Sequence, residues 1–120
     1  MTDAVFRDRE LPATLDTGAE TTDLYAAFAK AMPSLLRESG TGSATEGIGV
    51  GGAERFDSIT LAELPVRLGG LDTVLRPARV LLKQIGPERS AGNLGLDLLK
   101  QAGWFKIDFE AMILELHGKP

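Results

Sequence analysis

The chain has 120 residues, of which 43% are hydrophobic and 25% are charged, and its formal net charge is −4. These values are typical of one soluble globular domain, and we expect a single domain over residues 1–120, either a whole protein or a piece of a longer one. The acidic charge gives no reason to expect nucleic acid or an anionic membrane as a partner; no apolar run approaches the ~18 residues that span a bilayer, and residues 1–10 do not resemble a secretory signal.

The chain has no Cys and a single His, His117, close to the C-terminus. Without Cys there is no thiol nucleophile, no disulfide and no cysteine zinc site. A lone His near the chain end is a poor candidate for the positioned base of a Ser-His-Asp site. We therefore expect neither a metal nor a cofactor, and in a hydrolase the carboxylates would carry the chemistry. The absence of Cys fits a reducing compartment without requiring one, so the compartment stays open.

The N-terminal half alternates between strand and helix patterns. Residues 4–15 predict two short strands joined by a polar turn. Residues 23–32 predict a helix, which Thr22 or Asp23 would cap and Pro33 would end. Residues 37–45 are rich in Ser, Thr and Gly and predict a loop.

A glycine-rich hairpin is expected next. Two apolar stretches flank Gly51 and Gly52, and adjacent glycines supply the positive φ angles that such turns require. Alternating apolar residues then predict strands over residues 64–68 and 74–82, with a turn at residues 69–70. A loop over residues 83–90, a short helix after Gly95 and two strands over residues 104–109 and 112–116 complete the chain.

About seven short strands, two short helices and many glycine turns predict an all-β fold. The architecture that such a pattern favours is a small closed β-barrel. No internal repeat and no second copy of any candidate site is visible.

Chemistry is most evident in the run Leu15-Asp16-Thr17-Gly18-Ala19. A carboxylate at the end of an apolar strand is costly to bury alone. Thr17 offers a hydroxyl, and Gly18 lets the backbone turn tightly and bring amide groups near Asp16. Two such carboxylates held close together share one proton, so that one acts as base and the other as acid on a water between them. Because the chain has one such run, the partner would be Asp16 of a second copy. The alternative is architectural, since Asp, Thr and Gly are also common turn residues.

The sequence resembles the retropepsin-like aspartyl proteases, particularly the bacterial branch, over residues 4–116. The run around Asp16 matches the active-site run of that family, and the glycine hairpin follows where the family has its flap. The segment from Asn93 through Gly95 to Leu99 resembles the second family signature, although Asn93 stands where an apolar residue is usual. The resemblance implies an acid-protease barrel that pairs as a homodimer, or with a second lobe supplied by another domain of a longer chain.

The resemblance also implies roles for individual residues. Asp16 would be catalytic, Thr17 and Gly18 would support the catalytic loop, and Ala19 would line the cleft. Glu20 would contact the backbone of the substrate or remain solvated. The flap tip would comprise Val50, Gly51 and Gly52, and the mostly apolar pockets would draw on Ala19, Ile48, Val50, Leu82 and Leu94, with Asn93 beside them.

Two functions follow from these expectations. The first is an aspartic endopeptidase that binds an extended polypeptide between two barrels. The second is a non-catalytic module that keeps the groove for dimerisation or peptide binding. The substrate and the cleavage preference are not encoded in any pattern that we recognise.

Overall fold

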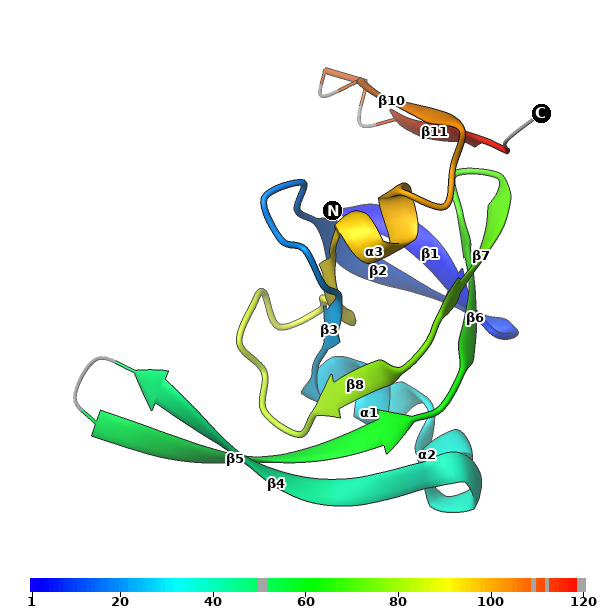
Figure 1. The fold of residues 1–120 in the computed structure, drawn as a ribbon. Helices are drawn as coiled ribbons and strands as arrows, with labels where there is room; N and C mark the ends of the chain where they lie inside the picture. The colour runs from blue at the N-terminus through cyan, green and yellow to red at the C-terminus, as the bar shows by residue number, and fades with distance from the viewer. Residues whose placement is uncertain (50–51, 109, 112, 119–120) are drawn as a thin grey trace.

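In a computed structural model the chain is described over residues 1–49, 52–108, 110–111 and 113–118, except for the side chains of residues 42–57. Most of the described residues lie in strands, as expected, and the helices are short (Figure 1). The helices are α1 (Ala26–Ala31), α2 (Pro33–Ser39) and α3 (Leu96–Leu99). The strands are β1 (Thr2–Phe6), β2 (Arg9–Leu15), β3 (Asp23–Leu24), β4 (Gly40–Gly49), β5 (Gly52–Leu61), β6 (Leu64–Leu68), β7 (Leu71–Leu75), β8 (Ala78–Leu81), β9 (Gly92–Leu94), β10 (Trp104–Asp108) and β11 (Ile113–His117).

Nine strands form one hydrogen-bonded sheet in the order β4-β5-β8-β3-β9-β2-β1-β6-β7. Within the described residues β4 and β7 are its two edges, and the sheet does not close on itself. The mostly-β class with short helices is therefore confirmed, but the predicted closed barrel is not. β10 and β11 form a separate two-stranded sheet at one end of the molecule (Figure 1).

Three predicted hairpins are confirmed. β1 and β2 pair around a turn in which Arg7 has a φ of 61°. β4 and β5 pair from Gly40 opposite Leu61 to Gly49 opposite Gly52, while residues 50–51 between them lie outside the described part. β6 and β7 turn at two glycines with positive φ, and alternate residues of β6 are buried, as the apolar alternation predicted.

Three boundaries were predicted wrongly. Residues 23–24 form β3 rather than the start of a helix. The helix that follows, α1, does end before Pro33, and Pro33 begins a second helix, α2, because proline lacks only an N–H that the first helical turn leaves unused. The expected loop over residues 37–45 is the end of α2 followed by β4. The single strand expected over residues 74–82 is divided at Pro77, which cannot donate to a ladder.

The core lies between the main sheet and the helices. Phe6 of β1 and Phe28 of α1 are fully buried and meet edge to face, with ring centroids 5.4 Å apart. Leucine and valine side chains from β3, β6, β8, β9 and α3 complete the core. Packing of this kind fixes the ends of β2 and β9, where the candidate site begins.

Candidate active site

Asp16 directly follows β2, and its backbone is held by β9. The two strands are parallel, with Leu15 opposite Leu94. The Asp16 N–H donates to the carbonyl oxygen of Leu94 over 2.9 Å. Because Leu94 is fully buried, this contact ties the start of the candidate loop to the hydrophobic core.

Each oxygen of the Asp16 carboxylate accepts one hydrogen bond. The Gly18 N–H donates to Oδ1 over 2.9 Å, and Asn93 Nδ2 donates to Oδ2 over 3.1 Å. The Asn93 amide and, next, the Gly18 N–H lower the pKa of Asp16, against a smaller opposing effect of burial; the Ala19 N–H also lowers it. Donors of this kind favour the charged carboxylate and fix its plane. Asn93, which departs from the family pattern, is thus satisfied by Asp16 itself.

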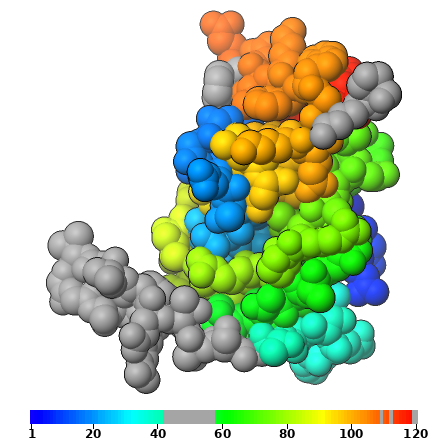
Figure 2. All heavy atoms as spheres, in the orientation of Figure 1, coloured from blue at the N-terminus to red at the C-terminus, as the bar shows by residue number. Residues whose placement is uncertain are grey.

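The loop after Asp16 is anchored to α3. Thr22 donates its N–H and its hydroxyl to the two carboxylate oxygens of Asp97, over 2.9 and 2.6 Å. The Leu96 N–H donates to the carbonyl of Ala19 over 2.8 Å. At Gly95 a Cβ would lie 2.7 Å from that carbonyl oxygen, so glycine is needed for this close approach. In Figure 2 the segment after β2 (blue) and α3 (yellow) lie directly against each other.

The other residues predicted for the site lie in different environments. Thr17 and Glu20 are exposed and Ala19 is half-buried. Leu94 has no exposed surface, so its side chain belongs to the core rather than to a pocket wall. Leu82 is exposed, in the segment after β8. Gly52 begins β5; the side chain of Ile48, and Val50 and Gly51, lie outside the described residues.

Sequence reasoning missed a polar face on the strands beside Asp16. Residues opposite one another on neighbouring strands project from the same side of a sheet. Asn93 of β9 is opposite Asp23 of β3, and Asp23 is opposite Arg79 of β8. We call the surface formed by Asp16, Asn93, Asp23 and Arg79 the polar face. The alternation of Asp23 with Leu24 and of Arg79 with Val80 was a signal for it, but the pairing of β3 with β8 (parallel) and with β9 (antiparallel) was not visible in the sequence.

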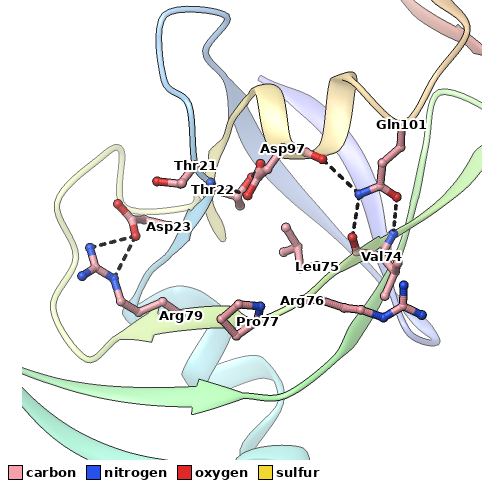
Figure 3. Close-up of a pocket in the computed structure, with 10 residues that line it drawn as sticks. All are labelled: Thr21, Thr22, Asp23, Val74, Leu75, Arg76, Pro77, Arg79, Asp97 and Gln101. Carbon is pink, nitrogen blue, oxygen red and sulfur yellow. Dashed lines mark hydrogen bonds and ion pairs between the residues drawn. The ribbon is translucent and has the colours of Figure 1, made fainter.

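The polar face is held together by direct contacts. Arg79 forms an ion pair with Asp23, with Nη2 3.0 Å from Oδ1 (Figure 3). Tyr25, two residues after Asp23, is buried, and burial is the main cause that raises the pKa of its hydroxyl. The negative charges of Asp23 and Asp16 raise that pKa further, so the hydroxyl lies within the field of both carboxylates.

A pocket of about 720 Å³ adjoins the Asp23–Arg79 pair (Figure 3). Its walls come from the loop after Asp16, from β7 and β8, and from α3. Figure 3 shows the ion pair at one end and the Gln101 amide, bonded to the backbone of Val74, at the other. The walls combine charged, polar and apolar residues.

Among the described residues there is no group of three or more His, Cys, Asp or Glu side chains placed to hold a metal ion. Of the helices in the described part of the chain, none is long and apolar enough to cross a membrane.

No protein-family model matches the sequence, and no curated protein matches it. Solved structures do match the fold. A retropepsin-like aspartic protease from Rickettsia conorii is 22% identical, with a TM-score of 0.62 over 89% of this chain and 74% of that one. The retroviral protease-like domain of Ddi1 from Leishmania major is also 22% identical, with a TM-score of 0.62 over 95% and 84% of the two chains. EIAV protease, solved with the inhibitor HBY-793, is 23% identical, with a TM-score of 0.55 over 89% and 90%. The resemblance to retropepsin-like aspartic proteases is therefore confirmed at the level of structure, and the chain has their fold.

Proposed function

We propose that this chain is an aspartic endopeptidase in which Asp16 residues from two copies form one catalytic pair. The observation that carries the proposal is the placement of Asp16. It lies at a rigid strand end, partly exposed, with both carboxylate oxygens held by donors, in a fold similar to that of aspartic proteases. Within the described residues no hydrogen bond joins Asp16 to a second carboxylate, so the acid partner would come from another copy.

In the proposed reaction the charged carboxylate removes a proton from a water molecule while the water oxygen bonds to the peptide carbonyl carbon. The protonated carboxyl donates its proton to the carbonyl oxygen, which gives a tetrahedral diol. The carboxyl that took the water proton then gives it to the leaving nitrogen as the C–N bond breaks, and one diol hydroxyl returns its proton to the other carboxylate. Since the two carboxyls share one proton, they would titrate as a pair, and the rate would depend on pH as a bell-shaped curve.

The C-terminal hairpin supports the pairing of two copies. β10 and β11 pair only with each other among the described strands, so the other edge of β10 is free, whereas the Leu116 N–H of β11 donates to the Gly69 carbonyl over 3.1 Å. Trp104 and Ile113 are more than half exposed on this hairpin, as is Met1 beside it. An apolar pocket of about 230 Å³ joins Met1 and Ile113 to Leu15, the residue before Asp16. A second copy that covered this surface would bring its own Asp16 toward the first, and the loop over residues 16–22 would lie beside the dimer axis.

One observation favours the second candidate function, a non-catalytic dimerisation or peptide-binding module. Asn93 donates to Asp16 Oδ2, and an amide donor there stabilises the charged carboxylate and occupies an oxygen that a shared proton would use. In such a module the groove would bind peptide without hydrolysis.

Cleavage of an unfolded protein by an Asp16→Asn variant separates the two candidates. We expect the variant to retain its fold and dimeric state and to lose at least ~10³-fold in kcat/KM, because the reaction would lack its base. Asp8→Asn, a matched change in the exposed β1–β2 turn, should leave the rate unchanged. Equal cleavage by Asp16→Asn and the unmodified chain would remove the enzyme proposal, whereas no cleavage by either would favour the binding module.

A further inference from the structure

The polar face extends from Asp16 across β9, β3 and β8 toward the β4–β5 hairpin. In the sheet order the strands from β2 to β5 are β2, β9, β3, β8 and β5. Asn93, Asp23 and Arg79 stand opposite one another on the three intermediate strands, and Thr60 of β5 stands opposite Arg79. A peptide bound between Asp16 and this hairpin would therefore run along the polar face.

The spacing of the strands relates this face to the bond that Asp16 would attack. Neighbouring strands are about 4.8 Å apart, so β3 lies about 10 Å from β2. An extended peptide advances about 3.3 Å per residue, and its side chains alternate in direction. The side chain that meets Asp23 would thus belong to a residue within about three positions of the scissile bond, and Arg79, one strand further from β2, is beside that side chain because it is paired with Asp23.

The Asp23–Arg79 pair keeps hydrogen-bonding capacity for a ligand. Arg79 Nε and Nη2 both bind the same oxygen, Asp23 Oδ1, over 3.1 and 3.0 Å. No hydrogen bond within the described residues uses Asp23 Oδ2 or Arg79 Nη1. The two side chains are 33% and 46% exposed, so the pair offers one acceptor and one donor to the surface.

Building on the proposed function, we propose that Asp23 and Arg79 determine specificity by selecting a substrate residue with an amide side chain, Gln or Asn. An amide presents a carbonyl to Arg79 and an N–H to Asp23 and adds no charge. A substrate carboxylate would be attracted by Arg79 but repelled by Asp23, and a substrate cation would meet the reverse. A Leu side chain would cover polar atoms without bonding them, which costs free energy.

A set of substrate peptides tests the inference. The peptides carry Gln, Leu, Glu or Lys at one position and are otherwise identical, and the varied position is each of those within three residues of the cleaved bond. At one position we expect kcat/KM for Gln to exceed that for Leu by about tenfold or more. The double variant D23L/R79L should abolish this preference. R67L/D72L, which removes an exposed cross-strand pair of 2.9 Å on β6 and β7, is the matched control and should retain it.

A second variant tests the inference even if D23L/R79L does not fold. Asp23→Asn preserves the shape of the side chain but replaces the free acceptor with a donor. We expect the preferred substrate residue to change from Gln to Glu, because the substituted site then offers only hydrogen-bond donors and the positive charge of Arg79. Equal kcat/KM for Gln and Leu at every position, or an unchanged Gln preference in Asp23→Asn, would overturn the inference.

Binding measurements separate failure of this inference from failure of the proposed function. Calorimetry with Asp16→Asn and the same peptides reports recognition without hydrolysis. If the Gln peptide binds more tightly than the Leu peptide but the unmodified chain cleaves neither, the proposed amide recognition stands and the proposed endopeptidase activity is rejected. Cleavage without any such preference would reject the recognition alone, and equal or absent binding of both peptides would also count against it.

Discussion

The two faces of strands β2, β9, β3 and β8 differ sharply, although the same short segments build both. One face carries Leu15, Leu94, Leu24 and Val80, of which the last three have no exposed surface. The other is the polar face, which carries the candidate catalytic carboxylate. Because strand side chains alternate, a shift of one residue in register would exchange the two faces. Fold and chemistry therefore depend on the same register, and substitutions on the two faces should have separable effects.

The largest effect on stability is expected on the apolar face. Leu94→Ala should lower the free energy of unfolding by about 3 kcal/mol, because it leaves a cavity in the core. Asn93→Ala, at the adjacent residue but on the polar face, should cost less than about 1 kcal/mol. Denaturant unfolding of both variants measures the difference. Similar costs for the two would contradict the division of the strand into a core face and a functional face.

The next effect concerns association of two copies. Ile113→Asp places a charge on the exposed apolar surface of β11 and should weaken dimerisation at least tenfold, since a buried unpaired carboxylate is costly. Sedimentation equilibrium measures the dissociation constant. Ile85→Asp, at an equally exposed apolar residue outside the hairpin, is the control and should leave the constant unchanged. If Ile85→Asp alone weakened the dimer, the interface would include Ile85 rather than the C-terminal hairpin.

A subtler change is expected at the carboxylate itself. Asn93→Leu removes the largest cause that lowers the pKa of Asp16, so this pKa should rise. A carboxylate with a lowered pKa in the folded state stabilises the fold above its unfolded pKa and loses that contribution as pH falls through the folded pKa. In the variant this contribution should be smaller and its loss should be complete at a higher pH, and the acid limb of the rate profile should move to higher pH as well. Carbon-13 NMR titration of the Asp16 carboxyl measures the pKa, and an unchanged value would show that the 3.1 Å contact is absent in solution.

The smallest effect is expected for an ion pair away from the polar face. Arg67→Leu breaks the exposed contact with Asp72 and should change the free energy of unfolding by less than about 0.5 kcal/mol. Thermal unfolding at low and high salt would detect a larger contribution. A larger cost would mean that the R67L/D72L control is not neutral.

Much of the fold was predictable where the pattern is local. Alternating Leu64, Val66 and Leu68 identified β6, paired glycines identified the β6–β7 turn, and the pairing of β4 with β5 was also expected. The errors arose where tertiary contacts decide. Two residues suffice for β3 because β8 and β9 flank it, and no sequence pattern predicts a strand that short.

The candidate site was predictable only in part. The motif around Asp16 was recognisable, and Asn93 could be placed near the cleft as a departure from the family pattern. Its hydrogen bond to Asp16 joins residues 77 positions apart and depends on parallel pairing of β2 and β9. No local pattern marks Arg79 as the partner of Asp23, because the two residues are 56 positions apart in sequence. Long-range register, rather than composition, decides which polar side chains meet.

The central claim is that each active site needs Asp16 from two copies, and a mixing experiment tests it most directly. The unmodified chain and Asp16→Asn are unfolded together in equal amounts, refolded and assayed at fixed total concentration. If active sites form only from two unmodified copies, random pairing leaves about one quarter of the activity of the unmodified protein. If each chain acts alone, about one half remains, and that result would contradict the account.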